Sequence, residues 1–267
     1  MNDFPIMDGM PGLIAPALAA GLLVASTHVP LGREVLKRGI IFLDLAVAQI
    51  AGLGAVAATA LFGWHGVGEQ VAAFLCALGA AWVFSWLERK GQTFQEALIG
   101  CAFVMAASLA ILVFAGDPHS GEEISNLMAG QILWVSWQHI GLVALVYVPV
   151  LALILARPQI AARAFYPLFA ACVTLSVQMV GVYLVFASLI LPALASAGIA
   201  GKTGLATGYT VALIAVLGGL ILSVFTDLPS SPVIVCSYAL AAIAVFFCRR
   251  CLPQETRVKA GEVLGGA

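Results

Sequence analysis

The amino-acid sequence predicts an all-α integral membrane protein, a polytopic helical bundle with about nine transmembrane helices. The first observation is composition: 62% of the 267 residues are hydrophobic and only 9% are charged, whereas soluble domains carry roughly 25% charged residues. The second is that the apolar residues form runs of about 20 residues, the length of a membrane-spanning helix. The third is that nearly all charges lie between these runs. Together they exclude a soluble enzyme, a disordered chain and a nucleic-acid-binding protein.

Apolar runs bounded by charged or turn residues predict the spans in order, because a backbone in lipid must satisfy its hydrogen bonds internally. The first run is expected to be a permanent helix and not a cleaved signal peptide, since no base precedes Arg33. The division between the sixth and seventh spans is the least marked, because the sequence is nearly continuously apolar there. The predicted spans are 11–31, 40–62, 68–87, 95–115, 137–156, 166–180, 182–200, 205–225 and 233–248.

The 12 basic residues predict the orientation of these spans. They follow the first, third, fifth, seventh and ninth spans, so an odd number of spans places all of them on one side. The positive-inside rule assigns that side to the cytoplasm. We therefore expect the N-terminus outside and the C-terminus in the cytoplasm. Residues 1–251 are expected to form a single transmembrane domain, and residues 252–267 a short polar cytoplasmic tail.

The stretch 116–136 does not have the pattern of a spanning helix. Ser120 and Glu123 are spaced as a capping box, in which the serine hydroxyl and the glutamate side chain each accept a hydrogen bond from the other residue's backbone N–H. The sequence therefore predicts a short helix over about 121–133, either on the external side or dipping back into the protein.

Asp44 is the one acid that falls inside a predicted span beyond its first two residues. An ionisable residue within the membrane is energetically expensive and is by default a functional hypothesis. The alternative is that Asp44 lies near the cytoplasmic end of its helix and pairs with Lys37, with Arg38 or with a helix N-terminus. Gln49 follows five residues later, so its side chain is not stacked directly on that of Asp44.

Ser176 and Gln178 are polar side chains within the sixth predicted span. They either line a polar path or form hydrogen bonds between helices, which is common in membrane proteins. The candidate translocation path therefore consists of Asp44, Gln49, Ser176 and Gln178.

The external stretch contains the only sequence cluster that resembles metal ligands. His119 and Glu122 stand close to Asp117 and Glu123, and imidazole and carboxylate groups bind zinc or harder divalent cations. The spacing matches no established metal signature, and the capping box already accounts for Glu123. No catalytic signature and no ATP-hydrolysing motif occurs in the sequence.

The segment from Leu155 to Tyr166 joins two spans on the predicted cytoplasmic side. It mixes Ala, Ile and Phe with Arg157 and Arg163. This mixture suits a short amphipathic helix at an interface, and the alternative is an ordinary loop at the membrane surface.

Five segments then recur in a fixed order over most of the chain: Leu36–Ala58, Gln95–Ala107, Glu122–Ser136, Val177–Ala197 and Gly218–Val235. Together they resemble the permease subunit of bacterial ATP-binding-cassette importers for zinc and manganese.

The resemblance implies a permease of the bacterial inner membrane that has no enzymatic activity of its own. It implies a second copy of the chain, cytoplasmic ATP-binding subunits that hydrolyse ATP, and an external metal-binding protein. No permanently bound cofactor is expected; the transported ion is Zn²⁺ or Mn²⁺. By similarity, the segment 157–166 docks the ATP-binding subunit through Arg157 and through its central residues, which are Gln159, Ile160, Ala161, Ala162 and Arg163.

The chain departs from the family pattern at some of its most informative positions. Asp44 matches an acid in the family's Gly-Asp-Ala-Leu-Ser-His stretch, but Ala48 replaces the histidine. Any role of that histidine in selecting the metal is therefore absent here. Asp227 matches the acid of an external Asp-x-Pro turn, although Ser231 stands where glycine is usual. The candidate metal-handling residues are thus Asp44, His119, Glu122 and Asp227.

The function expected from these patterns is import of a divalent cation by alternating access, coupled to a separate ATPase. Zinc is favoured by its frequency in the family, with manganese or iron as other possibilities. Two alternatives stay open. An ion-coupled secondary transporter of metal or small solute usually shows internal repeats, and none is evident here. A non-transporting membrane anchor subunit needs no cytoplasmic docking helix.

Overall fold

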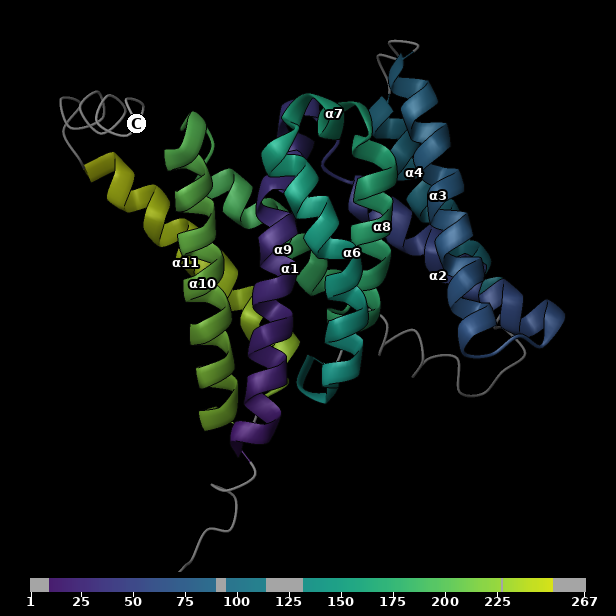
Figure 1. Ribbon diagram of the computed structural model, residues 1–267, viewed down its shortest axis with the longest axis horizontal. Coiled ribbons are helices and arrows are strands. Elements are labelled where there is room, and N and C mark those ends of the chain that lie inside the picture. Colours follow the sequence, from purple (N-terminus) through teal and green to yellow (C-terminus); the bar gives the residue numbers. More distant parts are fainter. Residues whose placement is uncertain (1–9, 90–94, 114–131, 227, 252–267) are drawn as a thin grey trace, which may run out of the picture.

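The computed structural model describes residues 10–89, 95–113, 132–226 and 228–251, and within these ranges every regular element is a helix (Figure 1). The predicted short helix at about 121–133 lies almost entirely outside these ranges. The elements are α1 (Met10–Arg38), α2 (Leu43–Phe62), α3 (Val67–Arg89), α4 (Gln95–Val113), η1 (Ile132–Trp134), α6 (Trp137–Ala156), α7 (Pro158–Arg163), α8 (Phe165–Val180), α9 (Val182–Ala195), α10 (Gly201–Thr226) and α11 (Ser230–Cys251).

The helical membrane bundle predicted from the apolar runs is confirmed. In the described part of the chain, six helices are long and apolar enough to cross a membrane, namely α1, α2, α3, α6, α10 and α11. Three further predicted spans coincide with shorter apolar helices, at Leu98–Ala110 within α4 and at α8 and α9. The count of nine spans and the orientation in the membrane stay predictions.

Glycines in the left-handed backbone region end one helix and separate two others. Gly181, with φ of 82°, lies between α8 and α9, so the predicted division of this apolar stretch into two helices is confirmed. Gly39, with φ of 69°, follows the end of α1. Such a residue favours glycine because a side chain would clash with the backbone, and it ends the helix that precedes it.

Two helix ends were predicted wrongly. Helix α1 continues to Arg38 and not to residue 31, because Glu34 pairs with Lys37 at 3.5 Å and with Arg38 at 3.1 Å one turn further along. Such pairs stabilise the polar end of a helix, beyond its apolar residues. Helix α9 ends at Ala195 and not at residue 200. An α-helix running through residue 200 would need a φ near −63° at each residue, whereas Gly198 has a φ of 77°.

Helix α1 occupies the middle of the bundle. It packs against α9, α10 and α6, while α2, α3 and α4 form a group on one side and α10 and α11 pair on the other (Figure 1). Helix α8 packs against α2 and α3 and so joins that group to the centre. The short α7 lies at one end of the bundle, between the ends of α6 and α8.

Close helix contacts in this bundle depend on glycine. A Cβ atom added at Gly32 would overlap the carbonyl oxygen of Leu189, and one added at Gly219 would lie 2.7 Å from the Cα atom of Ile234. The first contact joins α1 to α9 and the second joins α10 to α11. Small residues allow such backbone approach, which is a principal source of helix association in membranes.

Replacing Gly32 by Ala is therefore expected to destabilise the protein by about 2–3 kcal/mol, because the backbone at Leu189 must move to admit a methyl group. Reversible unfolding by detergent, followed by tryptophan fluorescence, measures this change. The matched control is Gly79→Ala in α3, where a Cβ meets nothing within 4 Å and alanine has the higher helix propensity. Equal stability of the two variants would contradict the close α1–α9 contact.

Candidate functional site

Asp44 lies in the first turn of α2 and is 2% exposed. Neither of its carboxylate oxygens has a hydrogen-bond partner among the described residues. Lys37 and Arg38 form their ion pairs with Glu34 and Glu88, so the proposed pairing of Asp44 with either base is not formed. The carboxyl group lies at the N-terminal end of α2, where the backbone N–H groups favour a negative charge. Asp44 is thus a buried acid with both oxygens available.

Glu96 brings a second carboxyl group to this end of α2, and sequence reasoning did not single it out. It lies in the first turn of α4, and its Oε1 atom accepts a hydrogen bond from the backbone N–H of Phe42 at 3.1 Å. Its Oε2 atom is buried and has no partner in the described part of the chain. Glu96 and Asp44 thus bring two carboxyl groups close to each other at this end of the bundle. The only feature of the sequence that pointed to Glu96 was its place as an acid at the very start of a predicted span.

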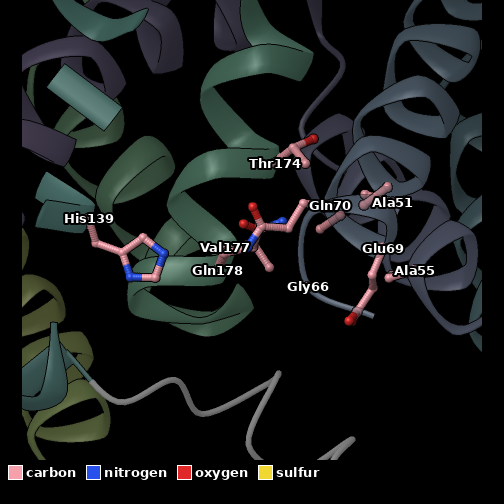
Figure 2. A pocket seen from close by; sticks show the side chains of 12 residues that line it. Ala51, Ala55, Gly66, Glu69, Gln70, His139, Thr174, Val177 and Gln178 are labelled. Carbon is pink, nitrogen blue, oxygen red and sulfur yellow. The ribbon is translucent and has the colours of Figure 1, made fainter. Parts of the chain in front are cut away.

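A cavity of about 320 Å³ opens between α2, α3, α6 and α8 (Figure 2). Ala48, one helical turn beyond Asp44, lines its α2 wall. The polar lining comes from three other helices, with Glu69 and Gln70 from α3, His139 from α6, and Thr174 and Gln178 from α8. The remaining lining residues are small or apolar. The cavity is therefore a mainly uncharged chamber with a few polar groups along its walls.

The structure brings only part of the predicted path to this cavity. Gln178 lines it and Asp44 lies one turn beyond it, whereas Gln49 and Ser176 are buried and do not line it. The Ser176 hydroxyl donates to carbonyl oxygens of its own helix, at 2.8 Å to Cys172 and 3.0 Å to Val173. This satisfies the side chain inside α8.

The other predicted metal-handling residues lie outside the described residues. They are His119, Glu122 and Asp227. Glu69, Gln70, His139 and Thr174 were missed as a group. The sequence placed Glu69 and His139 at the same predicted end of the bundle, and that was the only signal.

The segment predicted to be a short amphipathic helix does form one, α7, which begins with Pro158 in the position that suits proline. Ala161 faces the bundle and is buried, while Ile160 is 45% exposed. The remaining predicted docking residues are exposed, namely Arg157, Gln159, Ala162 and Arg163. Helix α7 thus presents a mixed apolar and basic surface at one end of the bundle.

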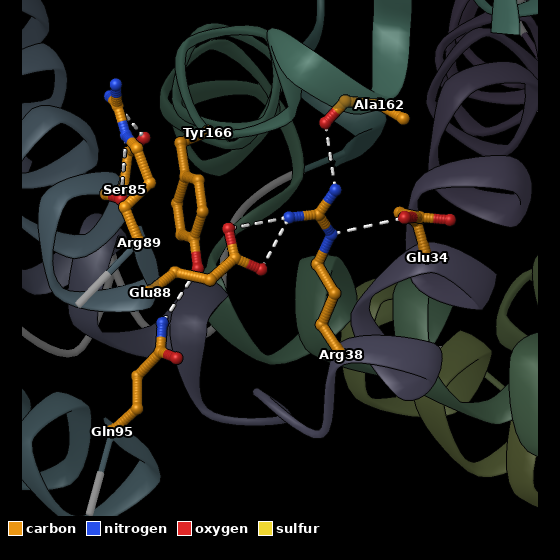
Figure 3. A network of polar contacts seen from close by, with 8 residues as sticks. All are labelled: Glu34, Arg38, Ser85, Glu88, Arg89, Gln95, Ala162 and Tyr166. Atoms are coloured by element: carbon orange, nitrogen blue, oxygen red, sulfur yellow. Dashed lines mark hydrogen bonds and ion pairs between the residues drawn. The ribbon is translucent and has the colours of Figure 1, made fainter. Parts of the chain in front are cut away.

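Arg38 ties α7 to the ends of three longer helices (Figure 3). Its Nη1 atom donates to both carboxylate oxygens of Glu88 in α3, at 2.6 and 2.8 Å, and its Nε atom donates to Glu34 in α1 at 3.1 Å. Its Nη2 atom donates to the carbonyl oxygen of Ala162 in α7 at 2.8 Å. The guanidinium also lies 4.5 Å from the ring centre of Phe165, at the start of α8. Only a guanidinium has enough directed donors to make these contacts together.

Replacing Arg38 by Lys is therefore expected to destabilise the protein by on the order of 1–2 kcal/mol even though the charge is kept. An ammonium group cannot bind Glu88, Glu34 and Ala162 in this geometry. Thermal unfolding in detergent measures the change. Lys37→Ala is the matched control, because its side chain is 70% exposed and makes one ion pair at 3.5 Å, and such pairs contribute little. If both variants unfold alike, Arg38 does not hold α7.

Known proteins match this chain over most of its length. The sequence profile described as the ABC 3 transport family matches residues 10–166 and 156–249. The high-affinity zinc uptake system membrane protein ZnuB of Haemophilus influenzae is 23% identical over 257 residues, covering 88% of this chain and 97% of that protein.

Two solved structures share the fold. A chain of PsaBC from Streptococcus pneumoniae in complex with Fab matches with a TM-score of 0.66 and 20% identity, covering 95% of this chain and 98% of that one. A chain described as that of a metal-chelate type ABC transporter in an inward-facing conformation matches with a TM-score of 0.63 and 16% identity, covering 92% of this chain and 88% of that one.

Proposed function

The chain belongs to the ABC 3 transport family, and from this membership we propose that it is the permease subunit of an ATP-driven importer of a divalent metal ion. The name of the ZnuB relative favours zinc as the ion, and manganese or iron are the nearest alternatives. The complete importer then contains two copies of this chain, two cytoplasmic ATP-binding subunits and an external metal-binding protein. Its place is the bacterial inner membrane.

One observation carries the mechanism. Helix α3 bears Glu88 at one end, held by Arg38 to α7, and Glu69 and Gln70 at the other, where they line the cavity. A displacement of α7 therefore acts on a helix that forms a cavity wall. This is the connection that an importer needs between an ATP-binding subunit on one side and an ion path within the membrane.

The charge distribution supports the orientation. The basic residues at the α7 end include Arg38, Arg89, Arg157 and Arg163, and we assign this end to the cytoplasm by the positive-inside rule. The cavity end with Glu69 and His139 then faces outward. A docked ATP-binding subunit contacts α7, and the external metal-binding protein delivers its ion near the cavity. The nine helices that coincide with the predicted spans would form one transmembrane domain over residues 1–251.

The ion path proposed here contains few strong ligands. Asp44 supplies one buried carboxylate, and Gln178 supplies an amide oxygen on the way to it. Tight coordination would trap the ion, whereas transport requires release after each step. Alternating exposure of Asp44 to the two sides, driven by ATP binding and hydrolysis below α7, completes the cycle.

Reconstitution tests this function. The permease is co-purified with candidate ATP-binding subunits and placed in liposomes, and Zn²⁺ accumulation and ATP hydrolysis are measured together. We expect accumulation that requires ATP, and hydrolysis that rises when the metal-loaded binding protein is added. Accumulation driven by an ion gradient without any ATPase would instead identify a secondary transporter. Absence of both accumulation and ATPase association would identify an anchor subunit.

A further inference from the structure

The cavity between α2, α3, α6 and α8 has an outer and an inner end. Glu69 and His139 lie in the first turns of α3 and α6, so both belong to the end of the bundle opposite α7. Ala48 and Thr174 lie further inside, toward Asp44. The cavity therefore leads from a mouth with one carboxylate and one imidazole to a point one turn from a buried acid.

The polar groups of this cavity are of the kinds that bind divalent cations. Carboxylate and amide oxygens suit hard cations, and imidazole nitrogen suits zinc and other transition metals. Figure 2 shows His139 and Glu69 on opposite sides of the view, with Gln70 and Gln178 between them. Within the described ranges Glu69 forms no ion pair, so its charge is available to an incoming cation.

Thr174 gives an independent indication of a ligand. It lines the cavity, is 2% exposed, and its hydroxyl oxygen has no hydrogen-bond partner among the residues that the structure describes. A buried hydroxyl without a partner is costly, and most such groups in native proteins are satisfied by water or by a ligand. A water molecule carried in with an ion would satisfy this hydroxyl.

The volume of the cavity bears on whether a divalent cation could enter it with its inner water shell. Its volume is about 320 Å³, and six water molecules occupy roughly 180 Å³ at their share of liquid volume. A cation with a complete inner water shell therefore fits. The described residues contain no group of three or more His, Cys, Asp or Glu side chains able to hold an ion, so nothing in this part of the chain replaces a full shell of water.

We propose that this cavity is a binding site for a hydrated divalent cation, with Glu69 and His139 as its charged and imidazole contacts at the mouth. Gln70, Gln178 and Thr174 contact the water shell, and Asp44 receives the ion at the inner end. This inference rests on the proposed function and adds to it an outer binding site for the ion. Of the residues named for this site, only Gln178 and Asp44 belong to the path predicted from the sequence.

Binding is measured on the full-length permease alone in nanodiscs, by electron paramagnetic resonance during titration with Mn²⁺. We expect one saturable site whose proton couplings show retained water ligands, and competition by Zn²⁺. Glu69→Gln should weaken binding at least about tenfold, because loss of a unit charge from a partly desolvated site costs more than the ~1.4 kcal/mol that a tenfold change represents. His139→Ala should weaken it several-fold, and Glu69→Asp should largely preserve it.

His65→Ala is the matched control, because His65 is an exposed histidine at the same end that does not line the cavity. Glu69 is half-buried and His139 is exposed, so their variants are expected to fold, and a melting curve checks this. Absence of Mn²⁺ binding, or binding that Asp44→Asn abolishes and Glu69→Gln leaves unchanged, would overturn the cavity site.

Uptake in the reconstituted complex separates the two proposals. Normal ATP-driven uptake by the parent protein, together with unchanged Mn²⁺ binding and uptake in Glu69→Gln and His139→Ala, overturns the cavity site and leaves the importer assignment standing. Absence of uptake in the parent protein, together with Mn²⁺ binding that depends on Glu69, supports the site and overturns the importer assignment.

Discussion

Replacing Asp44 by Asn is expected to reduce ATP-driven metal accumulation at least about tenfold, which corresponds to ~1.4 kcal/mol in the energetics of the limiting step. The two side chains have nearly the same size, so the change replaces the carboxyl group by an amide at a 2% exposed position without opening a cavity. Because residue 48 is alanine, Asp44 has no imidazole neighbour one turn further along α2 to take its place.

The folding stability of Asp44→Asn should change little or increase. Neither carboxylate oxygen has a hydrogen-bond partner in the described part of the chain, so no described bond is lost, and a buried charge is costly to the folded protein. Uptake in liposomes and thermal unfolding in detergent are measured on the same preparation. Normal uptake with a lowered melting temperature would show that Asp44 is structural.

The double substitution Ile160→Asp with Arg163→Glu should abolish ATP-driven uptake and the stimulation of ATP hydrolysis. Both side chains are exposed on α7 and lie away from the buried Ala161. The changes place acids where the proposed docking surface is apolar and basic, and like or unpaired charges at an interface cost several kcal/mol. Membrane insertion and Mn²⁺ binding by the permease alone should be retained.

Arg89→Glu is the control for this experiment, since it reverses a charge at the same end of the bundle in α3 and not in α7. Its described contacts are with Ser85 of its own helix. We expect co-purification with the ATP-binding subunit to fail for the α7 variant and to persist for the control. Unchanged uptake in the α7 variant would rule out α7 as the docking helix.

The fold was largely predictable because lipid restricts the backbone so strongly. Apolar runs alone located the helices, and the junction at Gly181 fell where the sequence predicted a division. The ends at Arg38 and Ala195 were wrong for local reasons that hydropathy does not report. At the first, ion pairs extend a polar helix end, and at the second, the backbone becomes left-handed at Gly198 shortly after the helix ends.

The site was less predictable because its parts are far apart in the sequence. Asp44 could be found as a single residue, since an acid in an apolar run is conspicuous. Glu69 and His139 become neighbours of one cavity only when α3 and α6 pack beside α2 and α8. The one contact considered for Arg38 was with Asp44, and its actual contacts with Glu88 and Ala162 join segments 50 and 124 residues away.

Helix α3 has a thermodynamic consequence for the importer as a whole. Glu88 and Glu69 stand about 28 Å apart along one helix, at 1.5 Å per residue, so docking at α7 and ion binding in the cavity, both as proposed above, would act on the same helix. Linkage then requires reciprocity: the factor by which a docked ATP-binding subunit changes the ion affinity equals the factor by which the ion changes the affinity for that subunit. An ion bound in the cavity would thereby change the affinity of the permease for the ATP-binding subunit that drives its transport.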